Sequence, residues 1–120
     1  MAKVQDAGLR AEQVAAAWLK KQGLRLLETR VSCRFGELDL VMRQGNELVL
    51  VEVKYRATGL DSALASVSAS KRKKLSLAAQ WLYSQRPEWG SLVWRFDVIA
   101  LAGDLSKPEV KWLPAAFELA

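Results

Sequence analysis

The stretch GELDLVMRQGNELVLVEVKYR, residues 36–56, decides the fold of this chain. Its first part, ELDLVMR (37–43), alternates charged and apolar residues with a period of two, as a strand with one buried face does. A Gly-Asn turn follows, and ELVLVEVKYR (47–56) then has an apolar residue at every position from Leu48 to Val51. Because both faces of such a segment must be covered, we predict a central strand that pairs with 37–43 as an antiparallel hairpin.

The segments around this hairpin predict two helices and three more strands. Residues rich in Ala and Leu precede Gly23, which often closes a helix. The connection 57–70 is rich in small residues, and its form stays open. In chain order we expect a helix at about 4–22, strands at 24–33, 37–43 and 47–56, a helix at about 70–84, and strands at 91–103 and 109–119. This order predicts an α/β or α+β fold, with helices packed against a mixed sheet.

The composition indicates one globular domain, residues 1–120, with a preference for polyanions. Apolar residues make up 51% and charged residues 26%, which is typical of a chain that folds alone. The net charge of +5 and the pI near 9.6 favour nucleic acid as a partner. No apolar run approaches the ~18 residues of a membrane span, and the N-terminus lacks the apolar core of a secretory signal. We therefore expect a cytoplasmic protein that does not associate with membranes.

The chain contains no histidine and a single cysteine, Cys33. The absence of histidine excludes Ser-His and Cys-His nucleophile pairs and every histidine metal site. A lone cysteine cannot form an intramolecular disulfide, so nothing indicates an oxidising compartment. Metal chemistry would have to use carboxylates, whose hard oxygen atoms select magnesium, manganese or calcium.

Charged residues in the predicted hairpin are placed for such chemistry. Residues two apart in a strand share a face, so Glu52 and Lys54 point to the same side, and Asp39 can face them across the hairpin. Two converging carboxylates repel each other unless a cation lies between them. Mg²⁺ or Mn²⁺ held by Asp39, Glu52 and the backbone carbonyl of Val53 would leave positions for water and a phosphate oxygen, as phosphodiester hydrolysis requires. Lys54 could position that water or stabilise the developing charge.

Three further residues are expected at the same site. Glu12, on the small apolar face of the first helix, offers another carboxylate that could bind the metal directly, through water, or hold a second ion. Lys71 begins the inward stripe of the second helix and could reach a phosphate. Arg56 lies beyond Lys54 on the same strand face. We expect Lys71 and Arg56 to bind nucleic acid rather than to cleave it.

The hairpin motif also has an ordinary structural explanation. An Asp followed by a distant Glu-x-Lys occurs by chance, and Glu-Lys pairs on strands are usually solvated. The apolar residues before Glu52 count against this explanation, because an ion in a central strand is costly without a partner. The role of Glu37 stays open between lining the site and holding the bend after Gly36. For Arg95 and Asp97, a structural ion pair is favoured over a catalytic role.

Together these residues resemble the YraN-like family of uncharacterised bacterial proteins, over nearly the whole chain. The resemblance rests on Glu12, GELDL (36–40), VEVKYR (51–56), Lys71 and RFD (95–97). That family is similar to the PD-(D/E)XK nuclease superfamily, which implies a restriction endonuclease-like fold of about five strands flanked by helices, as in Holliday-junction resolvases. By this resemblance Asp39, Glu52 and Lys54 occupy the D, E and K positions. Glu12 matches the first-helix glutamate of resolvase-like members.

The resemblance implies a metal-dependent nuclease that acts on DNA, with branched or damaged structures among the candidate substrates. A homodimer would suit the cutting of two strands. The alternative is a catalytically silent nucleic-acid-binding module on the same fold, and a protein-interaction adaptor is a third hypothesis. Leu38 stands in place of the proline of the superfamily motif, while the carboxylates and the lysine are intact.

Overall fold

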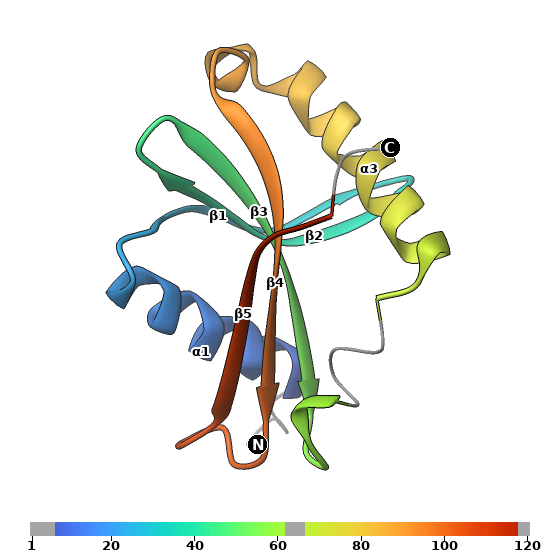
Figure 1. The fold of residues 1–120 in the computed structure, drawn as a ribbon. Coiled ribbons are helices and arrows are strands. Elements are labelled where there is room, and N and C mark those ends of the chain that lie inside the picture. The colour runs from blue at the N-terminus through green and yellow to red at the C-terminus, as the bar shows by residue number, and fades with distance from the viewer. Residues whose placement is uncertain (1–6, 62–66, 118–120) are drawn as a thin grey trace, which may run out of the picture.

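The computed structural model describes residues 7–61 and 67–117, which form a five-stranded mixed sheet with a helix on each face (Figure 1). The elements are α1 (Ala7–Lys21), β1 (Arg25–Cys33), β2 (Gly36–Gln44), β3 (Glu47–Arg56), α3 (Ala69–Gln85), the 3-10 turn η1 (Pro87–Trp89), β4 (Val93–Ala102) and β5 (Glu109–Phe117). The predicted α+β fold with about five strands is confirmed. Parts of the first predicted helix (4–6), the connection (62–66) and the last strand (118–119) lie outside the described residues.

The strands follow the order β1-β2-β3-β4-β5, and only the β3–β4 pair is parallel. A parallel pair needs a crossover connection, and α3 lies within it. Val51 of β3 lies opposite Leu40 of β2 on one side and beside Asp97 of β4 on the other. The segment 47–56 is therefore the predicted central strand, and its hairpin with β2 is antiparallel as predicted.

The alternating side chains of β3 supply both layers of the core. Val49 and Val51 pack on the side of α1, against Ala15 and Leu19. Leu48 and Leu50 pack on the side of α3, with residues that include Leu75, Ala78 and Leu82. Small residues on α1 let this helix approach the sheet closely, which brings Glu12, 9% exposed, onto its buried face as predicted. Within the described residues no helix is both long and apolar enough to cross a membrane.

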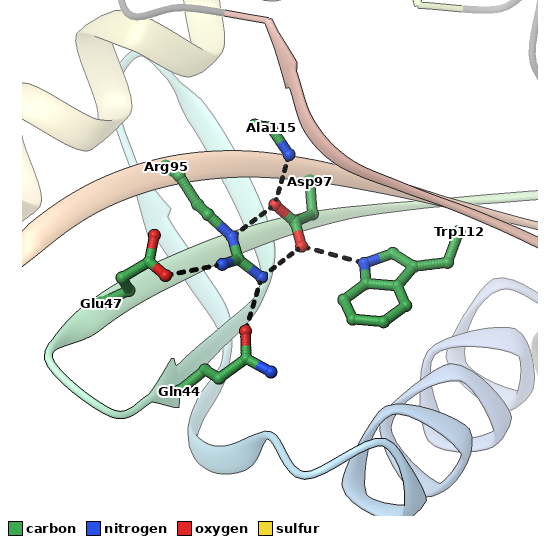
Figure 2. Close-up of polar contacts among 6 residues, drawn as sticks. All are labelled: Gln44, Glu47, Arg95, Asp97, Trp112 and Ala115. Atoms are coloured by element: carbon green, nitrogen blue, oxygen red, sulfur yellow. Dashed lines mark hydrogen bonds and ion pairs between the residues drawn. The ribbon is translucent and has the colours of Figure 1, made fainter.

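The predicted ion pair between Arg95 and Asp97 is present at the centre of a larger network (Figure 2). Asp97 is fully buried and accepts four hydrogen bonds, from Arg95 Nε (3.0 Å) and Nη2 (3.2 Å), Trp112 Nε1 (2.9 Å) and the Ala115 backbone N–H (3.0 Å). Arg95 also donates to Glu47 (3.0 Å) and Gln44 (3.1 Å). The network therefore joins β5 to β4 and to the β2–β3 turn, which is a structural role.

Candidate metal centre

The candidate site begins where β2 and β3 separate. Their ladder ends at the pair Leu40 and Val51, and Asp39 lies one residue beyond it. Asp39 Oδ2 accepts a hydrogen bond of 2.8 Å from the Val53 backbone N–H. The carboxylate thus satisfies a donor of β3 that no longer has a main-chain acceptor on β2. Asp39 therefore contacts β3 as predicted, but it does so just beyond the last paired residues of the hairpin and not from a position directly opposite a β3 residue.

A cavity of about 380 Å³ opens at this end of the sheet. Small residues of α1, including Gly8 and Ala11, form part of its wall and leave room beside the strands. All residues predicted for catalysis, metal binding or nucleic-acid contact line it: Glu12 from α1, Asp39 from β2, Glu52, Val53, Lys54 and Arg56 from β3, and Lys71 from α3. Arg95 and Asp97 do not line it.

The start of α3 is fixed so that Lys71 can reach this cavity. The Ser68 side chain accepts a hydrogen bond of 3.2 Å from the Lys71 backbone N–H and caps the helix. Lys71 therefore lies in the first turn, and its Nζ lies 3.9 Å from Oε2 of Glu52. Its side chain is 42% exposed, so it can also face a molecule outside the cavity.

Glu52 has the most strongly shifted pKa of the groups that line the cavity. The residue is 4% exposed, and its Oε1 lies 4.0 Å from Lys54 Nζ. Its Oε2 is buried and makes no hydrogen bond within the part of the chain that the structure describes. Burial, together with the hydrogen bonding and charge of Asp39, raises the pKa of Glu52 to about 9, against the opposing charges of Lys54 and Lys71. Such a combination of burial and specific charge partners is typical of functional sites.

The pKa of Lys54 is shifted in the opposite direction, below its ordinary value. Its side chain is 12% exposed, and burial is the main cause that lowers its pKa. Glu52 opposes this shift and Lys71 adds to it, through hydrogen bonding and through its positive charge. A lysine amine with a lowered pKa releases and accepts protons closer to neutral pH than an ordinary lysine does.

Asp39 also belongs to a second group of carboxylates, which it forms with Glu12 and Glu37. Oxygen atoms of Glu12, Glu37 and Asp39 all lie within 4.8 Å of one another. Burial raises the pKa of Glu12, Arg30 opposes this, and the charges of Asp39 and Glu37 add to it. Arg30 Nε donates to Glu12 Oε1 at 2.8 Å, and Ser32 Oγ donates to Glu37 Oε2 at 3.1 Å. Glu37 therefore lies near Glu12 and Asp39, although it does not line the cavity, and its role stays a prediction.

Sequence reasoning missed Arg30 and Ser32, which hold these two carboxylates from β1. Arg30 is 18 residues from Glu12 in the chain, and it adopts a left-handed backbone conformation with φ of 49°. No local pattern indicates this partner. For Ser32, a signal was available in the bend between the predicted strands 24–33 and 37–43, because a hairpin at this bend pairs Ser32 with Glu37 of β2.

These observations fit a divalent cation. The donor atoms on offer are carboxylate oxygens, which suit Mg²⁺ and Mn²⁺. Glu52 Oε2 makes no hydrogen bond among the described residues and has only the ion pair with Lys71 at 3.9 Å, so a cation bound to it would supply a closer partner. The site therefore has both the ligand chemistry and the unsatisfied atom that a bound cation would explain.

The raised pKa of Glu52 predicts that the stability of the protein without metal depends on pH. The folded state keeps this carboxyl protonated up to a pKa of about 9, whereas the unfolded chain loses the proton near 4.5. Between these values the unfolded state binds fewer protons, so the free energy of unfolding falls as pH rises, by up to about 1.4 kcal/mol per pH unit. Urea denaturation in EDTA at several pH values from 5 to 8 measures this slope. A flat profile would contradict it.

The fold and the site define a small α+β protein with a carboxylate-lysine cluster at the end of its central strand. Residues 11–101 match the family described as Uncharacterised protein family UPF0102, so the chain belongs to this family, and the YraN-like assignment is confirmed at that level. The matched region contains every residue predicted for the site.

Relatives of high coverage support the family assignment. A UPF0102 protein of Stutzerimonas stutzeri (strain A1501) is 43% identical, with 98% of this chain and 99% of that protein covered. The UPF0102 protein PputGB1_4524 of Pseudomonas putida (strain GB-1) is 44% identical, with 93% of each covered. The solved SPO1766 protein of unknown function from Silicibacter pomeroyi is 17% identical, with a TM-score of 0.44, over 98% of this chain and 78% of that one.

Proposed function

We propose that this protein is a Mg²⁺- or Mn²⁺-dependent nuclease of the PD-(D/E)XK type that hydrolyses phosphodiester bonds in DNA. The observation that supports this most is Glu52, a buried carboxylate with an unbonded oxygen, in one cavity with Asp39, Glu12 and Lys54. A structural role alone does not require several carboxylates and two lysines to converge on a space of about 380 Å³.

Asp39 and Glu52 would hold the cation, with the Val53 carbonyl and Glu12 as further oxygen donors. When bound, the cation polarises a phosphate oxygen and lowers the pKa of a nucleophilic water. The hydrogen bond from the Val53 N–H fixes the orientation of Asp39, so one of its oxygens is already positioned before a ligand arrives.

The lysines and Arg56 supply the remaining interactions with the substrate. Lys54 Nζ, 4.0 Å from Glu52, can donate to a water or to the phosphate on which negative charge accumulates. Lys71, in the first turn of α3, and the exposed Arg56 at the end of β3 bind neighbouring phosphates. The net charge of +5 adds long-range attraction for DNA.

A second candidate function is a nucleic-acid-binding module that does not cut. The two lysines near Glu52 favour it, because Lys54 and Lys71 could balance this carboxylate without a metal. This hypothesis predicts salt-sensitive binding of DNA without turnover, in which the logarithm of the binding constant falls linearly with that of the salt concentration.

One experiment separates the two functions. Purified protein is incubated with labelled duplex, single-stranded and junction DNAs, with Mg²⁺, Mn²⁺ or EDTA. We expect cleavage of at least one substrate that requires the metal and is lost in Asp39→Asn. Binding of several substrates without any cleavage would favour the binding module. Cleavage that survives Asp39→Asn would reject the assigned site.

Replacing Lys54 tests the lysine of the site directly. We expect Lys54→Ala to lower the cleavage rate by about 100- to 1000-fold, the usual effect of removing one donor to the transition state. Single-turnover rates at saturating DNA give the loss in the chemical step. Lys107→Ala removes an exposed charge on the β4–β5 connection and serves as the matched control. Equal rates for both variants would exclude Lys54 from the chemistry.

A further inference from the structure

A second cavity, of about 310 Å³, adjoins the candidate metal centre, and Glu12 lines both. It lies between α1 and β1, and β1 is an edge strand of the sheet. One wall is a stripe of α1 with the spacing of a single helix face: Leu9, Gln13, Ala16 and Lys20. Leu26 and Thr29 of β1 form the other wall, and the buried Leu40 lies at the base. We call this cavity the α1–β1 groove.

The lining of the α1–β1 groove suits a nucleobase better than a phosphate. Leu9, Ala16, Leu26 and Leu40 are apolar, and Gln13 and Thr29 add polar groups that can form hydrogen bonds. Enzymes that take up an unpaired base contact its faces with apolar or aromatic side chains and its edge with polar groups. A continuous duplex offers mainly phosphates and sugars at its surface, so its bases could not enter this space.

Lys20 is the only cation that lines the groove among the described residues, and it lies at the end away from Glu12. Lys20 follows Glu12 by eight positions on α1, which is about 12 Å along the helix axis. A stacked strand carries a phosphate every ~3.4 Å, so this distance corresponds to about three or four nucleotides. The exposed Lys20 is therefore placed to bind a phosphate a few nucleotides from the one at the metal centre.

We infer that the α1–β1 groove binds an unpaired nucleotide next to the bond that is cut, so that the substrate is single-stranded DNA or a single-stranded flap. This inference rests on the proposed nuclease function, because Glu12 lines both the groove and the candidate metal centre, so an occupant of the groove would lie beside the proposed site of cleavage. The size of the groove agrees, since ligand cavities begin at roughly 300 Å³ and this one is about 310 Å³.

Filling the groove tests the inference without any need for cleavage. Thr29 is exposed on β1, and Thr29→Trp places an indole in the space that the base would occupy. Fluorescence anisotropy in EDTA measures binding of a short single-stranded oligonucleotide and of its duplex. We expect Thr29→Trp to weaken single-strand binding at least about fivefold, as expected for loss of one base contact, with little change for duplex. Val93→Trp, at an exposed strand position on β4, is the control for added bulk.

The salt dependence of binding tests Lys20. For Lys20→Ala we expect the slope of log affinity against log salt to shrink by about 0.7 on the single strand, the value for one lost phosphate contact. The same slope should be unchanged on duplex. Two results for Thr29→Trp would contradict the inference. The groove does not bind a base if this variant has the same affinity for the single strand as Val93→Trp, or if its affinities for single strand and duplex fall by the same factor.

Failure of this inference can be distinguished from failure of the nuclease. If DNA is cut in a Lys54-dependent manner and Thr29→Trp leaves the preference for single strands unchanged, the groove assignment is wrong and the nuclease stands. If no DNA is cut under any condition and Thr29→Trp selectively loses single-strand binding, the groove is supported and the nuclease is rejected.

Discussion

Replacing Glu52 with glutamine is expected to abolish cleavage, by at least about a thousandfold, and at the same time to stabilise the protein without metal. Glutamine keeps the shape of the side chain and removes the carboxylate that would hold the cation. Because burial and the neighbouring Asp39 raise the pKa of Glu52 to about 9, the folded state already resists the charged form of this group. The neutral amide removes that cost.

Urea denaturation in EDTA at pH 8 measures the gain in stability. We expect more than about 1 kcal/mol, the equivalent of roughly one unit of pKa shift for a buried group. The pH dependence of unfolding between pH 5 and 8 should flatten in the same variant. Glu109→Gln, an exposed carboxylate at the start of β5, is the matched control and should leave both quantities unchanged. A Glu52→Gln variant that is less stable than the natural protein would contradict the burial cost.

The second large effect is expected at the Arg95–Asp97 network (Figure 2). Asp97→Ala removes a fully buried acceptor of four hydrogen bonds, and it leaves the side chain of Arg95, 15% exposed, without its main partner. Breaking a buried ion pair by removing one partner costs about 3–5 kcal/mol. That is a large part of the ~5–15 kcal/mol that stabilises a typical domain, so we expect the variant to be partly unfolded at growth temperature.

Chemical denaturation of Asp97→Ala and Asp97→Asn tests this expectation. The asparagine variant keeps an oxygen for Trp112 or Ala115 and should lose less. Asp104→Ala is the control, because Asp104 is an exposed carboxylate whose hydrogen bonds within residues 7–61 and 67–117 go to the neighbouring Ser106. If Asp97→Ala and Asp104→Ala have equal free energies of unfolding, the network does not contribute substantially to holding β5 in the sheet.

The fold could be predicted where the sequence pattern is local and unambiguous. The apolar residues from Leu48 to Val51 require cover on both faces, and β3 indeed lies between two helices and two strands. The neighbours of each strand could not be predicted in this way. Nothing within 47–56 indicates that Val51 lies beside Asp97 in a parallel pair, because that register depends on how α3 packs across the sheet.

The same distinction holds for the candidate site. Strand parity placed Glu52 and Lys54 on one face, and the stripe of small residues on α1 placed Glu12 on the buried side of its helix. The end of the β2–β3 ladder at Leu40, which makes Asp39 an acceptor for Val53, is a property of the whole sheet. Pairs distant in sequence, such as Arg30 with Glu12, become visible only in three dimensions.

The parallel pairing of β3 with β4 has a consequence for how the site is assembled during folding. All residues that line the candidate metal centre come from α1, β2, β3 and the start of α3, whereas β4 follows later in the chain. Strands β1 to β3 are joined by short turns and can associate early, because contacts between near neighbours cost little chain entropy. Glu52 pairs with Val98, so β3 becomes an inner strand only after β4 docks. We infer that a chain still being synthesised carries the carboxylates before it carries the burial that shifts their pKa values, so the proposed activity would require the completed sheet.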